Sequence, residues 1–321
     1  MKAIRIHEVG GPEVLKYEDC PDPSPGPGQA LVDVQAIGVN FTDVNTRSGV
    51  NPPATFPMTP GREAAGVVSA VGEGVTDVKV GDRVVYCGVT GSYAEKVAVP
   101  ADVLINMPQG LDARMGAAVL LQGMTAHYLA YSTYPLEQGD SCLVHAAAGG
   151  TGLLLTQMAK LAGAYVFATV STDEKAALAR DAGADKTIIY TREDFEEEVR
   201  KATDGRGVNA VYDAVGKTTF DKSLRCLARL GCLALYGQAS GPVPPVPTSS
   251  LPGSAFLTRP SLGDYTATRE ELVKRAGDVL GWAASGELKV RIGGTFPLSE
   301  AAEAHRQLQG RHSTGKLILI P

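Results

Sequence analysis

Short apolar runs separated by turn residues fill the first part of the chain. Residues 30–39 are rich in apolar side chains, interrupted by Asp33 and Gln35, which is the pattern of a strand. The proline- and glycine-rich segment 21–28 before it fits neither a helix nor a central strand. Glycines near positions 72–74 and 81 mark turns between valine-rich runs. This pattern predicts a small antiparallel β-barrel.

The pattern changes in the middle of the chain, where apolar strands alternate with helical segments. Such alternation indicates βαβ units and a parallel sheet. A proline-rich loop at 241–247 ends the alternation. The expected strands are 141–146, 165–169, 186–189, 210–213 and 232–236, and the expected helices are 152–162, 174–182 and 194–203.

The last part of the chain returns to mixed structure. A helix is expected to begin near Thr268, a second near Ser299, and a strand is expected over 316–320. We expect this tail to return to the first domain. The predicted organisation is therefore a barrel domain from 1–122 and 265–321, and a doubly wound α/β domain from 123–264.

Composition and charge argue against several classes of protein, including nucleic-acid-binding, membrane-spanning and secreted proteins. The 321 residues are 44% hydrophobic and 20% charged, as in a globular chain, and the net charge of −5 argues against a nucleic-acid partner. No run approaches the roughly 18 apolar residues of a membrane span, and the N-terminus lacks a signal-peptide pattern. The five scattered cysteines favour a reducing compartment. Together these features predict a cytoplasmic protein without a membrane partner.

The strongest chemical motif is a turn of small residues between a predicted strand and a predicted helix. It reads Ala147-Ala148-Gly149-Gly150-Thr151-Gly152, with Ala147 in the place of the usual first glycine. Small residues let backbone N–H groups approach a diphosphate, and the helix N-terminus favours its negative charge. The strand before and the helix after this turn predict a dinucleotide site.

The end of the second strand of this domain distinguishes NADPH from NADH. An acid is usual there in NAD enzymes, but Ser171 and Thr172 occupy the turn and Lys175 follows one helical turn later. Two hydroxyls and an ammonium group suit a 2′-phosphate. Ser171 with Glu174 could form a simple capping box, either in place of this role or together with it, and Asp173 could contact a ribose hydroxyl. We expect NADPH.

Five motifs resemble, in order and spacing, the zeta-crystallin-like quinone oxidoreductases of the medium-chain dehydrogenase/reductase superfamily. The resemblance covers essentially the whole chain and implies a GroES-like β-barrel, a Rossmann domain and a homodimer. The strand from Cys232, together with the loop that follows it, is a candidate dimer edge by the same analogy. The motifs lie at 139–160, 40–49, 60–68, 122–126 and 313–316.

The resemblance also implies which residues contact each part of the cofactor. Two of them have simpler interpretations, because Tyr190 could merely end a strand and Arg311 could be a solvated charge. The implied contacts are Asn40 and Thr125 at the nicotinamide half, Phe256 and Leu257 beside its carboxamide, Tyr236 and Gly237 through the backbone, and Ser171, Lys175, Tyr190 and Arg311 at the 2′-phosphate end.

The zinc ligands of related alcohol dehydrogenases are missing. Arg62 stands where those enzymes have a zinc-binding histidine, and Cys87 is alone where their structural lobe needs four cysteines. We therefore expect no metal. Arg62 could pair with Glu63 or attract an anionic acceptor, and we expect the pairing with Glu63. Without a Lewis acid, an acceptor that is already electrophilic is favoured.

These features predict an NADPH-dependent quinone oxidoreductase, with Asn40, Thr125 or a water near the developing oxyanion. An NADPH-dependent reductase of α,β-unsaturated aldehydes or ketones is the alternative on the same scaffold. A third hypothesis is an NADPH-binding relative with a structural or RNA-binding role. Asn45, where many relatives carry tyrosine, leaves acceptor preference open. His127 and His145 are expected to pack or hydrogen-bond rather than catalyse.

Overall fold

The chain divides into two units in the computed structural model, which describes residues 1–321. The first unit comprises Met1–Leu121 and Thr266–Pro321, and the second comprises Gln122–Tyr265. The two ends of the chain thus build one unit, and the second unit is inserted between them.

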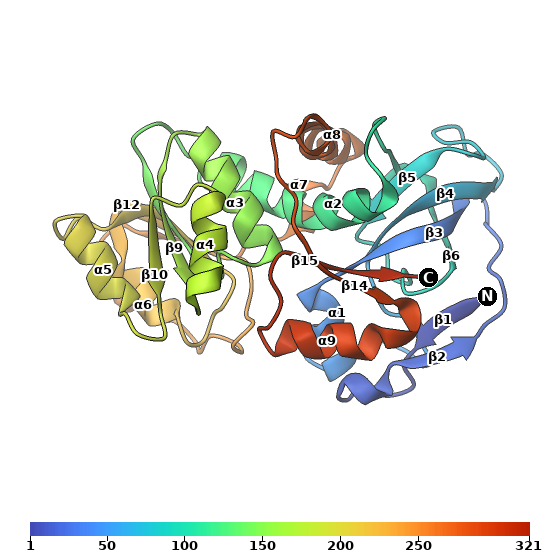
Figure 1. The fold of residues 1–321 in the computed structure, drawn as a ribbon, viewed down its shortest axis with the longest axis horizontal. Coiled ribbons are helices and arrows are strands. Elements are labelled where there is room, and N and C mark those ends of the chain that lie inside the picture. Colours follow the sequence, from blue (N-terminus) through green and yellow to red (C-terminus); the bar gives the residue numbers. More distant parts are fainter. The chain divides into compact units, whose positions relative to one another are not determined.

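The second unit is built on a six-stranded sheet whose paired strands all run parallel. Its order is β10-β9-β8-β11-β12-β13, so the chain winds outward from β8 in both directions. This is the doubly wound Rossmann arrangement. Figure 1 shows α3 and α4 beside this sheet. The strands are β8 Ser141–Val144, β9 Tyr165–Val170, β10 Lys186–Ile189, β11 Val208–Asp213, β12 Leu227–Leu235 and β13 Phe256–Thr258.

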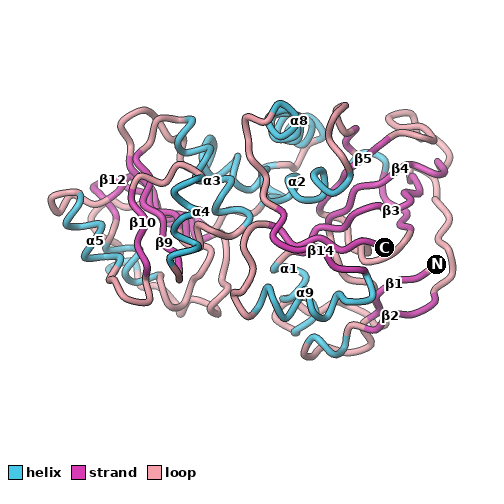
Figure 2. Tube along the Cα trace, viewed as in Figure 1, coloured by secondary structure: helices cyan, strands magenta, loops and turns pink.

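The helices of the second unit follow their strands closely. Asp194 caps α5, because its carboxylate accepts hydrogen bonds from the Glu196 and Glu197 backbone N–H groups. Figure 2 shows the helices and strands alternating along this part of the chain. The helices are α3 Gly150–Leu161, α4 Asp173–Asp181, α5 Phe195–Ala202, α6 Phe220–Arg225 and α7 Leu262–Tyr265, with a π-helix at Leu129–Thr133 and a 3₁₀ turn at Thr248–Ser250.

Most predicted elements of this unit are found within two residues of their expected bounds, but β12 begins five residues earlier than expected. Leu230 has a φ of 63°, and the pairing register with β11 shifts between Val208 and Ala210. The strand is therefore irregular before Cys232, and the continuous apolar run begins only at that residue. Helix α6 was not predicted.

The first unit contains a seven-stranded sheet of mainly antiparallel strands. Its order is β14-β15-β3-β4-β5-β7, and β6 pairs with β3 beside this path. The strands are β3 Gln29–Val39, β4 Glu63–Val71, β5 Arg83–Cys87, β6 Lys96–Pro100, β7 Ile105–Asn106, β14 Ile292–Pro297 and β15 Lys316–Ile320, and β1 Lys2–Arg5 pairs separately with β2 Lys16–Asp19.

The expected barrel is not closed. One edge of β3 pairs with β4, while its other edge pairs with β6 over Gln29–Asp33 and with β15 over Ile37–Val39. One edge of β3 therefore pairs with two different strands, and β7 and β14 remain at the two ends of the sheet. The GroES-like character of the strand order is retained, but closure is not detected.

Four helices belong wholly or partly to the first unit, and α9 packs against β14 and β15. Helix α8 begins after Thr268, where the sequence predicted a helix start, and Thr268 and Glu271 form a reciprocal capping box there that was not predicted. The helices are α1 Phe41–Ser48, α2 Ala113–Tyr128, α8 Arg269–Ser285 and α9 Ala301–Gln309, with 3₁₀ turns at Pro12–Val14, Ala101–Val103 and Leu298–Glu300. No helix in the chain combines the length and apolar character needed to cross a membrane.

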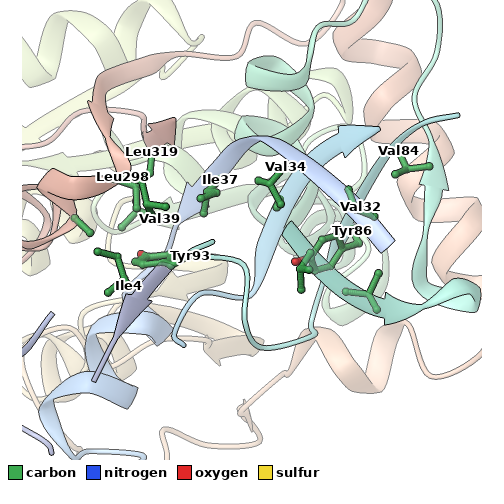
Figure 3. Close-up of a cluster of buried hydrophobic side chains, with 14 of the residues drawn as sticks. Ile4, Val32, Val34, Ile37, Val39, Val84, Tyr86, Tyr93, Leu298 and Leu319 are labelled. Carbon is green, nitrogen blue, oxygen red and sulfur yellow. The ribbon is translucent and has the colours of Figure 1, made fainter. Parts of the chain in front are cut away.

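The core of the first unit lies against β3. Alternate side chains of this strand, Val32 and Val34, face the same cluster as Tyr86 of β5. Further along β3, Val39 packs in the same cluster with Leu298 and Leu319 (Figure 3). The long strand therefore links the N-terminal strands to the returning C-terminal segment through a single apolar core.

Candidate active site

The switch point of the doubly wound sheet lies between β8 and β11, where the strand order reverses. Ligands of such sheets bind outside the carboxyl ends of the strands at this point. The β8–α3 turn, which carries Ala147 and Gly149–Gly152, begins there. The sequence-predicted dinucleotide turn and the topological switch point therefore coincide.

The backbone of this turn is tightly folded. Ala146 has a φ of 51°, and its carbonyl accepts from the Gly149 N–H at 2.9 Å. The Ala147 N–H donates to the Thr169 carbonyl at 3.1 Å, which ties the turn to β9. Helix α3 then begins at Gly150 with Gly149 as its N-cap. The first N–H groups of the helix consequently face outward at the carboxyl edge.

Two glycines of the turn have no room for a side chain. A Cβ at Gly152 would lie 2.4 Å from the Ala146 carbonyl oxygen and 2.7 Å from the Ala147 Cα. A Cβ at Gly150 would lie 1.8 Å from Gln122 Oε1, which is buried without a hydrogen-bond partner. The helix start is therefore packed directly on the turn, and a helix N-terminus reached through a turn of small residues is a common site for an anion.

A buried network of hydrogen-bonded side chains begins at His145, just before this turn. His145 Nδ1 lies 2.9 Å from Thr169 Oγ1, and His145 Nε2 lies 3.0 Å from Ser223 Oγ. The Ser223 hydroxyl donates to the Asp213 carboxylate at 3.0 Å. Burial lowers the pKa of His145, although the Asp213 charge opposes the shift. His145 is thus a hydrogen-bonding core residue, as expected, and it joins the ends of β8 and β11.

Asp213 also organises the loop after β11. Its carboxylate accepts from the N–H groups of Val215 and Gly216 and from the Thr219 hydroxyl. On the other side of the loop, the Tyr236 N–H donates to the Asp213 carbonyl at 3.0 Å. Asp213 was not predicted as a site residue. Its position at the end of a strand was the only sequence signal for this role.

The loop after β9 carries the residues predicted to surround a 2′-phosphate. Ser171 lies in the bend, and Lys175 lies in the first turn of α4. Thr172 caps the helix, because its hydroxyl accepts from the Lys175 N–H at 3.3 Å. The capping box expected between Ser171 and Glu174 is therefore wrong, because the helix begins one residue later than that motif requires.

The ends of β12 and β13 lie on the other side of the switch point. The Gly237 N–H donates to the Asp213 carbonyl, and a Cβ on Gly237 would lie 2.7 Å from the Ala214 carbonyl oxygen. A pocket at these strand ends is lined in part by Leu235, Gln238 and Leu257. Leu257 therefore faces a cavity, whereas Phe256 is 59% exposed on the edge strand β13.

The strand from Cys232 is not a sheet edge. Strand β12 pairs with β11 on one side and with β13 on the other. The strand from Cys232 is therefore wrong as a free edge. The edge strand on this side of the sheet is β13, which was too short to be recognised as a strand in the sequence.

In the first unit, Asn40 belongs to a buried polar cluster. Its amide Nδ2 donates to Glu63 Oε2 at 2.9 Å and to the Gly38 carbonyl at 3.2 Å, and its Oδ1 accepts from Lys316 Nζ at 2.7 Å. Both N–H groups of this amide are thus used inside the unit. They are not available as donors to an oxyanion, contrary to one of the roles expected for Asn40.

The cluster is centred on an ion pair between Lys316 and Glu63. The two charged atoms are 2.5 Å apart, and the side chains are 1% and 0% exposed. The second Glu63 oxygen accepts from the Leu121 N–H at 2.7 Å. Arg62, by contrast, donates to the Gly88 carbonyl. The expected pairing of Arg62 with Glu63 is wrong, because β4 turns Glu63 inward while Arg62 stays exposed.

The remaining predicted site residues, Thr125, Tyr190 and Arg311, lie on different elements and differ in exposure. Thr125 is buried in α2, in the second unit, whereas Arg311 is exposed beyond the end of α9, in the first unit. Tyr190 follows β10 and is 42% exposed. No group of three or more His, Cys, Asp or Glu side chains is arranged to hold a metal ion.

A second buried chain of polar groups lies beside Asn40. Tyr93 donates to Asp43 Oδ2 at 3.1 Å, and the Tyr93 oxygen lies 3.0 Å from His305 Nε2. Burial raises the pKa of Asp43 to about 6, against hydrogen bonding from Asn40. Burial lowers the pKa of His305 to about 3, with help from the Arg47 charge.

These two shifts have opposite effects on stability. The raised Asp43 pKa gives stability at low pH that is lost as the pH rises from about 3.8 to about 6. The lowered His305 pKa gives stability at neutral pH that is lost as the pH falls from about 6.5 to about 3. We expect His305→Asn to become more stable, and Asp43→Asn less stable, as the pH falls from 6 to 4, relative to the native chain. Urea unfolding at several pH values checks this, and parallel profiles for the two variants would contradict it.

A sheet of GroES-like topology and a Rossmann unit with a glycine turn at its switch point define the class of medium-chain dehydrogenases/reductases. Family models agree: residues 26–109 match the alcohol dehydrogenase GroES-like domain, and residues 150–275 match the zinc-binding dehydrogenase family. The chain belongs to the quinone oxidoreductase family of this superfamily.

Individual relatives match over nearly the full length. The chain is 44% identical to a quinone oxidoreductase of Pseudomonas aeruginosa, covering 100% of this chain and 99% of the relative. It is 43% identical to a 2-haloacrylate reductase of Burkholderia sp, covering 99% and 98%. The crystal structure of Escherichia coli quinone oxidoreductase complexed with NADPH matches with a TM-score of 0.98, 40% identity and complete coverage of both chains.

Proposed function

We propose that this chain is an NADPH-dependent quinone oxidoreductase. The observation that carries the proposal is the β8–α3 turn, in which a Cβ at Gly152 would strike the backbone and helix α3 begins at the switch point of the sheet. That cradle fits a dinucleotide diphosphate. The NADPH complex of the E. coli relative supports the same cofactor.

In this proposal the two ends of the cofactor are held by different parts of the chain. Gly149, Gly150, Thr151 and Gly152 hold the diphosphate, with Ala147 fixing the turn. The 2′-phosphate lies among Ser171, Lys175 and Tyr190, with Arg311 reaching it from the tail. The nicotinamide half is oriented by the backbone of Tyr236–Gly237 and by Phe256 and Leu257.

The bound cofactor supplies a hydride, and the protein must orient the acceptor and exclude water. The Thr125 hydroxyl is the side chain that we assign to the developing oxyanion. Asn40 has no N–H group left for that role, so in our proposal it acts through its bond to Lys316, which fixes the start of α1. Quinones suit such a site because the added charge delocalises over the ring without a metal.

The remaining proposals concern the domain bounds, the oligomeric state and the cellular location. We propose that 1–122 with 265–321 form the catalytic domain and that 123–264 form the NADPH-binding domain. A homodimer would use the free edge of β13, where exposed Phe256 provides apolar area next to unpaired backbone groups. The acidic charge and scattered cysteines favour a cytoplasmic location and a small-molecule substrate.

Replacing Lys175 tests the cofactor assignment. We expect Lys175→Ala to weaken NADPH binding about tenfold while changing NADH binding little, because only the 2′-phosphate needs the ammonium group. Isothermal titration with each cofactor measures both constants. Lys201→Ala, at the exposed end of α5, is the matched control. Equal losses for the two cofactors in Lys175→Ala would contradict the assignment.

Reduction of a conjugated carbonyl or acid at carbon is the second candidate. The relative named 2-haloacrylate reductase favours it, since an acrylate carries a conjugated double bond. Steady-state turnover with NADPH separates the two. A higher kcat/KM for a naphthoquinone supports quinone reduction, and a higher value for an enal or haloacrylate supports the alternative.

A further inference from the structure

The loops after β9 and β10 are joined at the end predicted for the 2′-phosphate. The Tyr190 N–H donates to the Val170 carbonyl at 3.0 Å, so the residue after the end of β10 still pairs with the last residue of β9. The Thr191 hydroxyl then donates to the Ser171 carbonyl, also at 3.0 Å. These contacts hold the β10 loop directly beside the turn that contains Ser171.

The next residue of the loop, Arg192, makes a two-pronged ion pair with Asp173. Its Nη1 donates to Oδ2 at 2.9 Å and its Nη2 donates to Oδ1 at 2.6 Å. Hydrogen bonding from Arg192 lowers the pKa of the Asp173 carboxyl. Both carboxylate oxygens of Asp173 therefore accept a charge-assisted hydrogen bond from the guanidinium group, in an ion pair that is exposed at the surface.

Asp173, the first residue of α4, lies two residues beyond Ser171, close to the strand end where an acid would recognise an unphosphorylated cofactor. In sheets of this type an Asp or Glu about twenty residues beyond the glycine turn accepts hydrogen bonds from the ribose hydroxyls of NADH. A free carboxylate there would also repel a 2′-phosphate. In the sequence, Asp173 counted against NADPH because its carboxylate could contact a ribose hydroxyl. In the structure this carboxylate is bound by Arg192, so Asp173 no longer counts against NADPH.

We propose that Arg192 determines cofactor selectivity by holding Asp173. Arg192 is a positioning residue: it occupies the carboxylate oxygens that a ribose diol would need, and it neutralises the charge that would oppose the phosphate. Lys175, two residues beyond Asp173 on α4, then supplies the cationic contact without competition. The inference rests on the proposed NADPH-dependent function and names the residue that sets its specificity.

A double-mutant cycle tests this role by equilibrium binding. The dissociation constants for NADPH and NADH are measured by isothermal titration for the native chain, Arg192→Gln, Asp173→Asn and the double variant. Arg192→Gln should weaken NADPH about tenfold and strengthen NADH, because the freed carboxylate repels the one and accepts from the other. Asp173→Asn should keep native NADPH affinity, and adding it to Arg192→Gln should restore that affinity.

Arg225→Gln is the matched control, because it breaks a similar ion pair, with Glu196 at 2.8 Å, between α6 and α5. It should leave the ratio of the two constants unchanged. An unchanged ratio in Arg192→Gln would overturn the inference. A double variant as weak as Arg192→Gln would also overturn it, since Arg192 would then contact the phosphate itself. A native chain that bound no NADPH would instead refute the proposed function.

Discussion

Gly152→Ala should bind NADPH at least about 100-fold more weakly than the native chain, a loss of roughly 2.7 kcal/mol. The added Cβ would lie 2.4 Å from the Ala146 carbonyl oxygen and 2.7 Å from the Ala147 Cα, and both are backbone atoms. The turn or the start of α3 must therefore move, which withdraws the helix N–H groups from the diphosphate. Isothermal titration with NADPH measures the loss.

The control for this substitution is Gly277→Ala, in the exposed middle of α8, where a Cβ would meet no atom within 4 Å. It should keep native NADPH affinity and gain about 0.5–1 kcal/mol of stability, because alanine favours a helix interior. A Gly152→Ala variant that folded and bound NADPH as tightly as this control would show that the turn does not hold the cofactor.

Lys316→Met should cost about 3–5 kcal/mol of unfolding free energy, because it leaves the Glu63 carboxylate buried without its partner. The ion pair spans 2.5 Å between fully buried groups, and Lys316 also binds Asn40. The long methionine side chain keeps most of the packing volume, so the loss reports on charge rather than on a cavity. Urea unfolding measures the change.

Adding Glu63→Gln should recover part of this loss, because a neutral amide still accepts from the Leu121 N–H and carries no buried charge. The double variant should be more stable than Lys316→Met by at least about 1 kcal/mol. A double variant less stable than the single one would mean that Glu63 is satisfied by groups other than Lys316.

Local patterns in the sequence were sufficient for much of the fold. The βαβ alternation predicted β10 with its observed bounds, the apolar run at the end of the chain predicted β15 with its observed bounds, and the small-residue turn before α3 predicted the candidate cofactor site. The helix expected to begin near Thr268 is also present as α8. These features depend on residues within one turn or one strand of each other, so their signal is contiguous in the chain.

The missed features depend on contacts between distant residues. Glu63 and Lys316 are 253 positions apart, and Arg192 and Asp173 are 19 apart on different loops. Neither pairing has a local pattern. Whether the barrel closes depends on which edge of β3 each later strand pairs with. The alternation of apolar residues predicts that a segment is a strand, but it does not predict its pairing partner. The role expected for Asn40 changed for the same reason.

The central claim is that a glycine turn holds NADPH while the protein passes its hydride to a quinone without a metal. The most direct measurement is the quinone-dependent loss of the near-ultraviolet absorbance of NADPH, with the chain exhaustively treated with a chelator. We expect oxidation at the same rate before and after chelation, and its loss in Gly152→Ala. No oxidation by the native chain with any quinone, or loss of activity on chelation that zinc restores, would contradict the account.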